Sequence, residues 1–152
     1  FDAMRHSEDP HVRAESEDLI WALWCSHEDE HAHNTMQKAI GALARKELKE
    51  SRRLLDNLVL DWPDWAEAWN KRATVYFLED RFLESIDDIQ KTLVLEPRHF
   101  GALSGLAQIC LQVGDEHSAL IVFDYVLNVN PHLQAVRETA DFLRSTLGVT
   151  IH

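Results

Sequence analysis

The sequence has few cysteines and no long apolar run, and each shortage excludes a class of protein. Cys25 and Cys110 are its two cysteines, without CxxC spacing, whereas small secreted scaffolds are cysteine-rich. We therefore expect two buried free thiols and favour a reducing compartment. No segment approaches the roughly 18 consecutive apolar residues of a membrane-spanning helix, so we expect no membrane insertion. The sequence begins at Phe1, so a targeting segment would be missing from view and localisation is otherwise open.

Basic residues are also scarce. The 152 residues hold 15 Lys and Arg against 26 Asp and Glu, for a formal net charge of −11. Binding to nucleic acid needs clustered cations that displace counterions from phosphates, and anionic membrane surfaces also attract basic segments. The charge balance therefore predicts that neither is a partner.

The common catalytic motifs are missing. There is no Ser-His-acid set, phosphate-binding glycine loop or dinucleotide fingerprint, but His27 to His31 matches the HExxH spelling. A zinc protease needs that motif on a helix in a walled cleft, with a third ligand. The hydrophilic stretch Ser26–His33 is instead predicted to be a loop. We expect no enzyme and no cofactor, and we keep metal binding by His27, His31 and His33 as a minor hypothesis.

What the sequence does contain is a repeat. Prolines recur at intervals of 34 residues, as do alanines and large apolar residues; the sets are Pro63, Pro97, Pro131; Ala39, Ala73, Ala107; and Leu55, Ile89, Phe123. A period of about 34 residues is typical of stacked helix-turn-helix units. Alanine lets two helix axes approach, and proline ends one pair before the next begins.

Apolar periodicity and end signals predict the helices. The predicted ranges are 10–24 for a leading helix, then 35–45 with 47–60, 64–78 with 81–95, 99–113 with 116–129, and 131–147. Asn34 or Thr35 is the expected cap of the second helix, and Asp115 caps the helix that follows it. Gly114 and Gly148 are expected left-handed stops, and residues 149–152 are expected to fray.

The best-formed unit carries a family signature at Trp69, Ala73, Tyr76, Ser85, Ile89, Thr92 and Pro97. With these residues the chain resembles the tetratricopeptide repeat (TPR) family, in its small three-repeat, stand-alone form. The resemblance implies an all-α, right-handed α-α superhelix of three helix pairs with a leading and a C-terminal capping helix. The implied segments are 1–33, three repeats over 34–131 (34–63, 64–97 and 98–131), and 132–152.

The resemblance also implies a binding face. In this family the first helix of each pair lines a concave groove that holds peptides, which here would involve Met36, Ile40, Glu67, Asn70, Lys71, Thr74, Ser104, Gln108 and Gln112. One known use is a two-carboxylate clamp for the acidic C-terminus of a heat-shock chaperone. Asn70 matches that clamp and Lys71 adds nearby charge, but Thr74, Ser104 and Gln108 depart from it. We therefore do not expect this ligand.

Trp62 and Trp65 flank Pro63. They are either exposed aromatic anchors for a partner or pack against the leading helix, which carries Trp21 and Trp24. Most of the remaining histidines, with His99 counted among them, and paired acids such as Asp87-Asp88 are expected on the surface. The resulting hypothesis is a non-catalytic adaptor or assembly factor that binds a peptide or partner helix. The alternatives are a self-associating scaffold, hence a homo-oligomer, and a metal-responsive protein.

Overall fold

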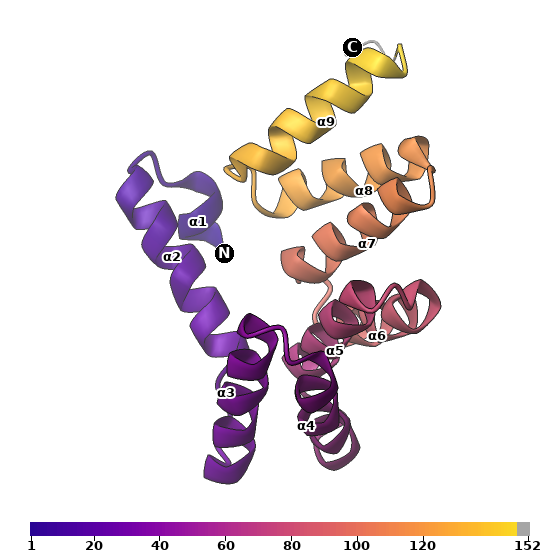
Figure 1. Cartoon of the computed structure of the whole chain (residues 1–152). Coiled ribbons are helices and arrows are strands. Elements are labelled where there is room, and N and C mark those ends of the chain that lie inside the picture. Colours follow the sequence, from indigo (N-terminus) through magenta and orange to yellow (C-terminus); the bar gives the residue numbers. More distant parts are fainter. Residues whose placement is uncertain (149–152) are drawn as a thin grey trace. The chain divides into compact units, whose positions relative to one another are not determined.

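The computed structural model describes residues 1–148, and this part of the chain forms nine helices and no strand (Figure 1). They are α1 (Asp2–His6), α2 (Pro10–Trp24), α3 (Glu30–Ala44), α4 (Leu48–Asp61), α5 (Ala66–Leu78), α6 (Phe82–Leu95), α7 (Phe100–Gln112), α8 (Glu116–Val129) and α9 (Gln134–Thr146). The predicted all-α class is confirmed. A search of the described helices finds none with the length and apolar character needed to cross a bilayer.

The chain divides into two compact units. One is Ile20–Ala102, which holds the end of α2, helices α3 to α6 and the start of α7. The other combines Phe1–Leu19 with the chain from Leu103 onward. Helices α2 and α7 therefore each contribute residues to both units, and each unit has its own hydrophobic cluster.

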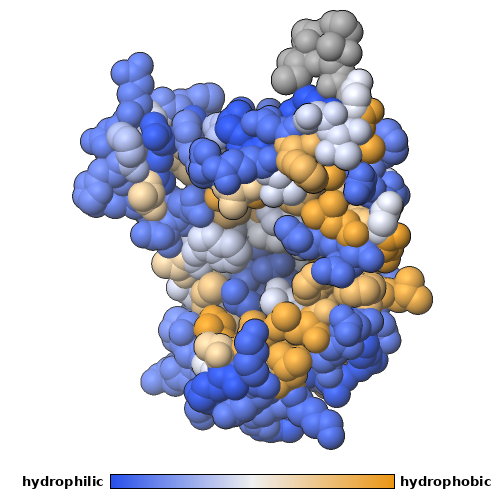
Figure 2. Space-filling view, turned by 45° about the horizontal axis from the view of Figure 1, so that its top comes forward, coloured by the Kyte–Doolittle hydropathy of each residue, from blue (hydrophilic) through white to orange (hydrophobic). Residues whose placement is uncertain are grey.

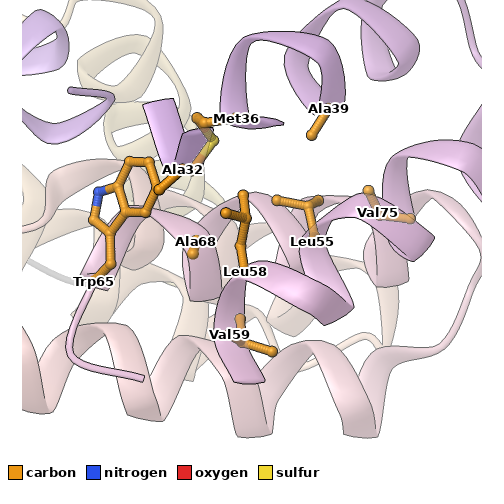
Figure 3. Close-up of a cluster of buried hydrophobic side chains, with 9 residues drawn as sticks. All are labelled: Ala32, Met36, Ala39, Leu55, Leu58, Val59, Trp65, Ala68 and Val75. Atoms are coloured by element: carbon orange, nitrogen blue, oxygen red, sulfur yellow. The ribbon is translucent and has the colours of Figure 1, made fainter. Parts of the chain in front are cut away.

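The core of the Ile20–Ala102 unit is built from α3, α4 and α5. Figure 3 shows the side chains converging: Ala32, Met36, Ala39, Leu55, Leu58, Val59, Trp65, Ala68 and Val75. The alanines of the repeat, Ala39, Ala73 and Ala107, are 1%, 3% and 0% exposed, as expected for sites of close helix approach. In two pairs a serine hydroxyl adds a link, because Ser51 Oγ donates to the Ala39 carbonyl at 2.9 Å and Ser85 Oγ to that of Ala73 at 2.7 Å.

A single arginine joins three helices of this unit. Arg72 on α5 donates to both carboxylate oxygens of Asp88 on α6, at 2.8 and 2.9 Å, and to Asp56 on α4 at 3.1 Å. Asp88 is buried, so the prediction that it lies on the surface was wrong. Burial, together with the Asp87 and Asp56 carboxylates, raises the pKa of Asp88 by more than the Arg72 guanidinium lowers it.

The second unit brings distant parts of the sequence together. Its cluster comprises Ala107, Ala119, Leu120, Phe123, Ala140 and Leu143, from α7, α8 and α9. Two hydrogen bonds tie the N-terminal segment to the α8–α9 junction: Asn130 Nδ2 donates to Glu17 at 3.1 Å, and His132 Nε2 lies 3.0 Å from the Arg5 carbonyl.

Two predicted helix starts were wrong. Helix α3 begins at Glu30 because the Asp29 side chain accepts the Ala32 N–H at 2.8 Å, and Ala32 is fully buried. The predicted loop is correspondingly short, and His31 and His33 are helical. Pro131 does not open α9, since the Asn130 side chain accepts the His132 N–H and holds a turn before Gln134. The predicted end at 149–152 lies outside the described residues.

Left-handed residues recur at the same period as the prolines. The φ angles are 62° at Lys46, 59° at Asp80, 81° at Gly114 and 67° at Gly148. The two glycine stops are therefore confirmed. Only glycine adopts this conformation without steric cost, so Lys46 is strained.

Replacing Lys46 with glycine is expected to raise the free energy of unfolding by about 0.5–1 kcal/mol. Relief of about 1–2 kcal/mol of left-handed strain exceeds the entropy that glycine adds to the unfolded chain. Urea denaturation measures the difference. Lys38→Gly in the interior of α3 is the matched control and should destabilise by about 0.5–1 kcal/mol. A loss of stability in both variants would contradict the strain argument.

Candidate functional site

Aromatic side chains gather where the end of α2 meets α5 and the start of α7, all within the Ile20–Ala102 unit. We call Trp21, Trp24, His99 and Phe100 the aromatic cluster. Trp24 stacks on the His99 imidazole with ring centroids 4.0 Å apart and planes inclined by 11°. Trp21 meets His99 and Phe100 edge-on, each at 5.6 Å.

A group of hydrogen-bonded polar side chains, centred on Glu67, lies buried beside the aromatic cluster. His99 Nε2 is 2.6 Å from Glu67 Oε2, and both side chains are fully buried. The Ala102 N–H donates to His99 Nδ1 at 3.0 Å. Because Nδ1 accepts, the proton of a neutral imidazole is on Nε2, which donates to the Glu67 carboxylate. His99 therefore caps α7 and binds Glu67 at once.

The other oxygen of Glu67 is also occupied. Asn70 Nδ2 donates to Oε1 at 3.0 Å, and Lys71 Nζ lies 3.3 Å from it. Burial alone would raise the pKa of Glu67, but His99, Lys71 and Asn70 together outweigh burial and hold that pKa below its ordinary value. The carboxylate is thus kept ionised inside the protein.

The end of α2 fits tightly against this group. Lys71 Nζ lies 5.2 Å from the centroid of the Trp21 ring, within cation–π range. The Trp65 indole N–H donates to the Trp24 carbonyl at 2.8 Å. A Cβ on Gly101 would lie 2.5 Å from Trp21 Cη2, so only glycine leaves room for this ring.

The groove residues predicted on α3 and α5 differ in exposure. Met36 is fully buried in the core, and Ile40 packs against the same cluster. Glu67 and Asn70 are 1% and 6% exposed, and they bind each other. The prediction that these two side chains are accessible in a groove was therefore wrong. Lys71 is partly exposed and Thr74 is exposed. Asn70, the one match to a carboxylate clamp, is therefore already engaged internally.

The residues predicted on α7 belong to the other unit. Ser104 is half-buried, while Gln108 and Gln112 are exposed. Phe142 lies at the same repeat position of α9 as Gln108 in α7 and is 68% exposed. The sequence analysis missed Phe142, although the 34-residue period marks it.

Of the two candidate anchors, Trp65 is only 8% exposed. It packs in the core and bonds to the leading helix, so the hypothesis of packing is confirmed and that of an exposed anchor is wrong for Trp65. Trp62 is half-buried against the same core. It also lines a small pocket with polar residues of α3 and α4, His31, Thr35, Lys38, Arg53, Asn57 and Asp61.

The histidines do not converge. His27 Nδ1 accepts the Asp29 N–H at 3.0 Å, and its ring packs on Trp62 and Trp65 at 4.4 and 4.7 Å. His27 precedes α3 while His31 lies on it, so the HExxH residues do not share one helix face. Residues 1–148 hold no group of three or more His, Cys, Asp or Glu side chains placed to bind a metal.

His99 was wrongly predicted to lie on the surface. One signal could have placed it: His99 occupies the repeat position of Trp65, which is a core position. The two cysteines are free and half-buried rather than buried. Burial, then the Glu67 carboxylate, raises the pKa of the Cys25 thiol, and Lys71 partly opposes this, so Cys25 is not an activated nucleophile.

Known proteins resemble this chain in sequence and in structure. No protein-family model matches it. A TPR repeat-containing protein of Rhizobium etli is 31% identical over 148 residues, which cover 97% of this chain and 72% of that protein. The Sgt2 TPR domain from Aspergillus fumigatus superposes with a TM-score of 0.71 at 16% identity, over 79% of this chain and 81% of that one.

Two further structures have the same fold. The first TPR domain of Spaghetti, bound to the HSP90 peptide SRMEEVD, gives a TM-score of 0.72 at 16% identity, over 80% of this chain and 98% of that one. MamA gives 0.71 at 13% identity, over 91% and 78%. At such low identities these likenesses show the fold alone.

Proposed function

The chain belongs to the tetratricopeptide repeat family, and we propose on that basis that it is a non-catalytic module that binds another protein, as an adaptor or assembly factor. The proposed site, taken within each unit separately, is the exposed face of a first helix, where a peptide or partner helix would lie. One observation carries the proposal: the side chains exposed at these positions are a hydroxyl on α5, Thr74, and two amides on α7, Gln108 and Gln112. Such groups can bond to a peptide backbone without requiring one ligand charge.

The contacts of Glu67 with its neighbours limit the kinds of ligand that this face can bind. The TPR domain of Spaghetti, which has a similar fold, is bound to a peptide that ends Glu-Glu-Val-Asp. In this chain Asn70, the residue that matches a carboxylate clamp, is buried and bonded to Glu67, and the net charge of −11 would repel an acidic ligand. We propose a neutral or basic segment as the partner.

Pull-down from an extract of the source cells tests the face helix by helix. Thr74→Arg on α5 and Gln108→Arg on α7 each place a long cation on the proposed face and are expected to reduce recovery of the specific partner about tenfold or more. Gln90→Arg on α6 and Asn128→Arg on α8 are matched controls at exposed positions of second helices. They should recover the partner as the unmodified protein does. Equal recovery by all four variants would exclude the first-helix face.

Self-association is the second candidate, favoured by apolar side chains that remain exposed. Leu19 and Leu23 are four residues apart on α2 and are 60% and 65% exposed, which places them on one helix face. Figure 2 shows further hydrophobic residues in patches between hydrophilic ones. Sedimentation of the same preparations decides between the candidates, because a monomer at working concentration excludes a dimer scaffold.

A further inference from the structure

The end of α2 covers residues that the first-helix face would otherwise offer to a partner. We propose that the segment Trp21–Cys25 is an intramolecular ligand of α5, which a partner with a similar aromatic pair must displace. This inference rests on the proposed function, since it concerns access to the same face. The segment precedes the three helix pairs, so its place in the fold is that of an added peptide.

The covered residues are fully engaged by internal partners. Glu67 uses one oxygen for His99 and the other for Asn70 and Lys71. Trp24 stacks on His99 and Trp21 lies under the Lys71 ammonium. The two tryptophans of α2 thus bind to the same side chains that hold the Glu67 carboxylate, and a partner reaching Glu67 or Asn70 would first have to remove them.

The surface under the tryptophans has the features of a receptor. Gly101 leaves the space that the Trp21 ring fills. Trp65 donates its indole N–H to the Trp24 carbonyl at the C-terminal end of α2. Aromatic stacking, a cation over a ring and one main-chain hydrogen bond are together a typical way to bind an aromatic side chain pair.

The covering segment is held on one side only. Ile20 is buried and Trp21 and Trp24 are half-buried, whereas Ala22 and Leu23 face solvent. Because few side chains anchor the segment, another segment with aromatic residues at i and i+3 can compete for the same surface. The expected partner chemistry is therefore a peptide with such an aromatic pair.

A peptide of the chain's own residues 16–27, with serine in place of Cys25 and a fluorescent label, is the probe. The full-length Trp21→Ala/Trp24→Ala variant has the surface uncovered. Fluorescence anisotropy is expected to show that this variant binds the peptide about tenfold or more tightly than the unmodified protein, because a tethered competitor acts at an effective millimolar concentration. A peptide with both tryptophans changed to alanine should bind neither protein.

Gly101→Ala tests the same contact in a chain that keeps its tryptophans. The added methyl should push Trp21 away, so hydrogen exchange at residues 20–24 should be faster than in the unmodified protein. Gly41→Ala is the control, because its methyl would meet only the Arg45 guanidinium at 3.2 Å, and a flexible side chain can move. Adding Gly101→Ala to the double tryptophan variant should abolish peptide binding.

Three outcomes would overturn the proposal: a folded double variant that does not bind the peptide, equal binding by the unmodified protein, or unchanged hydrogen exchange in Gly101→Ala. Failure of the proposed function is separate. If the peptide binds as expected but Thr74→Arg and Gln108→Arg leave partner recovery unchanged, the intramolecular contact stands and the first-helix face is excluded. If those variants lose the partner but the peptide does not bind, only the intramolecular ligand is wrong.

Discussion

Replacing His99 with alanine is expected to lower the free energy of unfolding by about 3–5 kcal/mol, the typical cost of leaving a buried charge without its partner. The substitution leaves the Glu67 carboxylate buried without its shortest hydrogen bond, at 2.6 Å. It also removes the acceptor for the Ala102 N–H at the start of α7 and the ring on which Trp24 stacks. Urea denaturation at pH 7 measures the loss.

The pH dependence of the free energy of unfolding tests whether the ionised Glu67 carboxylate causes part of the loss in His99→Ala. Since the pKa of Glu67 in the folded protein is below its ordinary value of 4.5, the group stabilises the fold above about pH 4.5. That contribution is lost as pH falls through the lowered pKa. The variant Glu67→Gln should therefore lose less stability than the unmodified protein as the pH is lowered from 5 through the pKa of Glu67. Parallel pH profiles, or a loss below about 1 kcal/mol for His99→Ala, would contradict a buried carboxylate that depends on His99.

Replacing Arg72 with alanine is expected to cost a similar amount, about 3–5 kcal/mol at pH 7. Arg72 supplies both hydrogen bonds to Asp88, whose side chain is only 4% exposed, and it packs over the Trp69 and Tyr76 rings. Without it a carboxylate is buried alone. The loss of unfolding free energy should be smaller at low pH. Burial already raises the pKa of Asp88, and protonation removes the uncompensated charge.

An exposed arginine provides the control for this second result. Arg53→Ala removes an ion pair with Glu50 whose side chains are 62% and 48% exposed, so it should cost far less than Arg72→Ala, because solvent screens an exposed pair. The double variant Arg72→Met/Asp88→Leu should recover much of the loss, because apolar side chains can replace a buried ion pair. Equal losses for Arg53→Ala and Arg72→Ala in denaturation would show that burial does not determine the cost.

The period of 34 residues was sufficient to predict the parts of the fold that depend on backbone geometry. Ala39, Ala73 and Ala107 are buried, and Gly114 and Gly148 are left-handed, as their spacing and residue types indicated. These features repeat because each helix pair has the same geometry. The helix starts were less predictable, since a cap depends on one side chain, such as Asp29, reaching one N–H group.

The charged interior of the candidate site was not predictable in the same way. Glu67 and His99 are 32 residues apart and Arg72 and Asp88 are 16 apart, and neither separation is a multiple of the period. Polar residue types also favour a surface assignment when each is considered alone. Only the folded chain shows that these partners meet, and that His99 and Arg72 each hydrogen-bond to a buried carboxylate.

The left-handed residues at the ends of the first helices have a consequence for engineering. Lys46, Asp80 and Gly114 have the same backbone conformation at equivalent positions, and Gly148 follows α9 in the same manner. By this measure α9 is the first helix of a further unit rather than an unrelated cap. These residues are therefore natural splice points, at which helix pairs could be duplicated, deleted or exchanged while the chain direction at each junction is preserved.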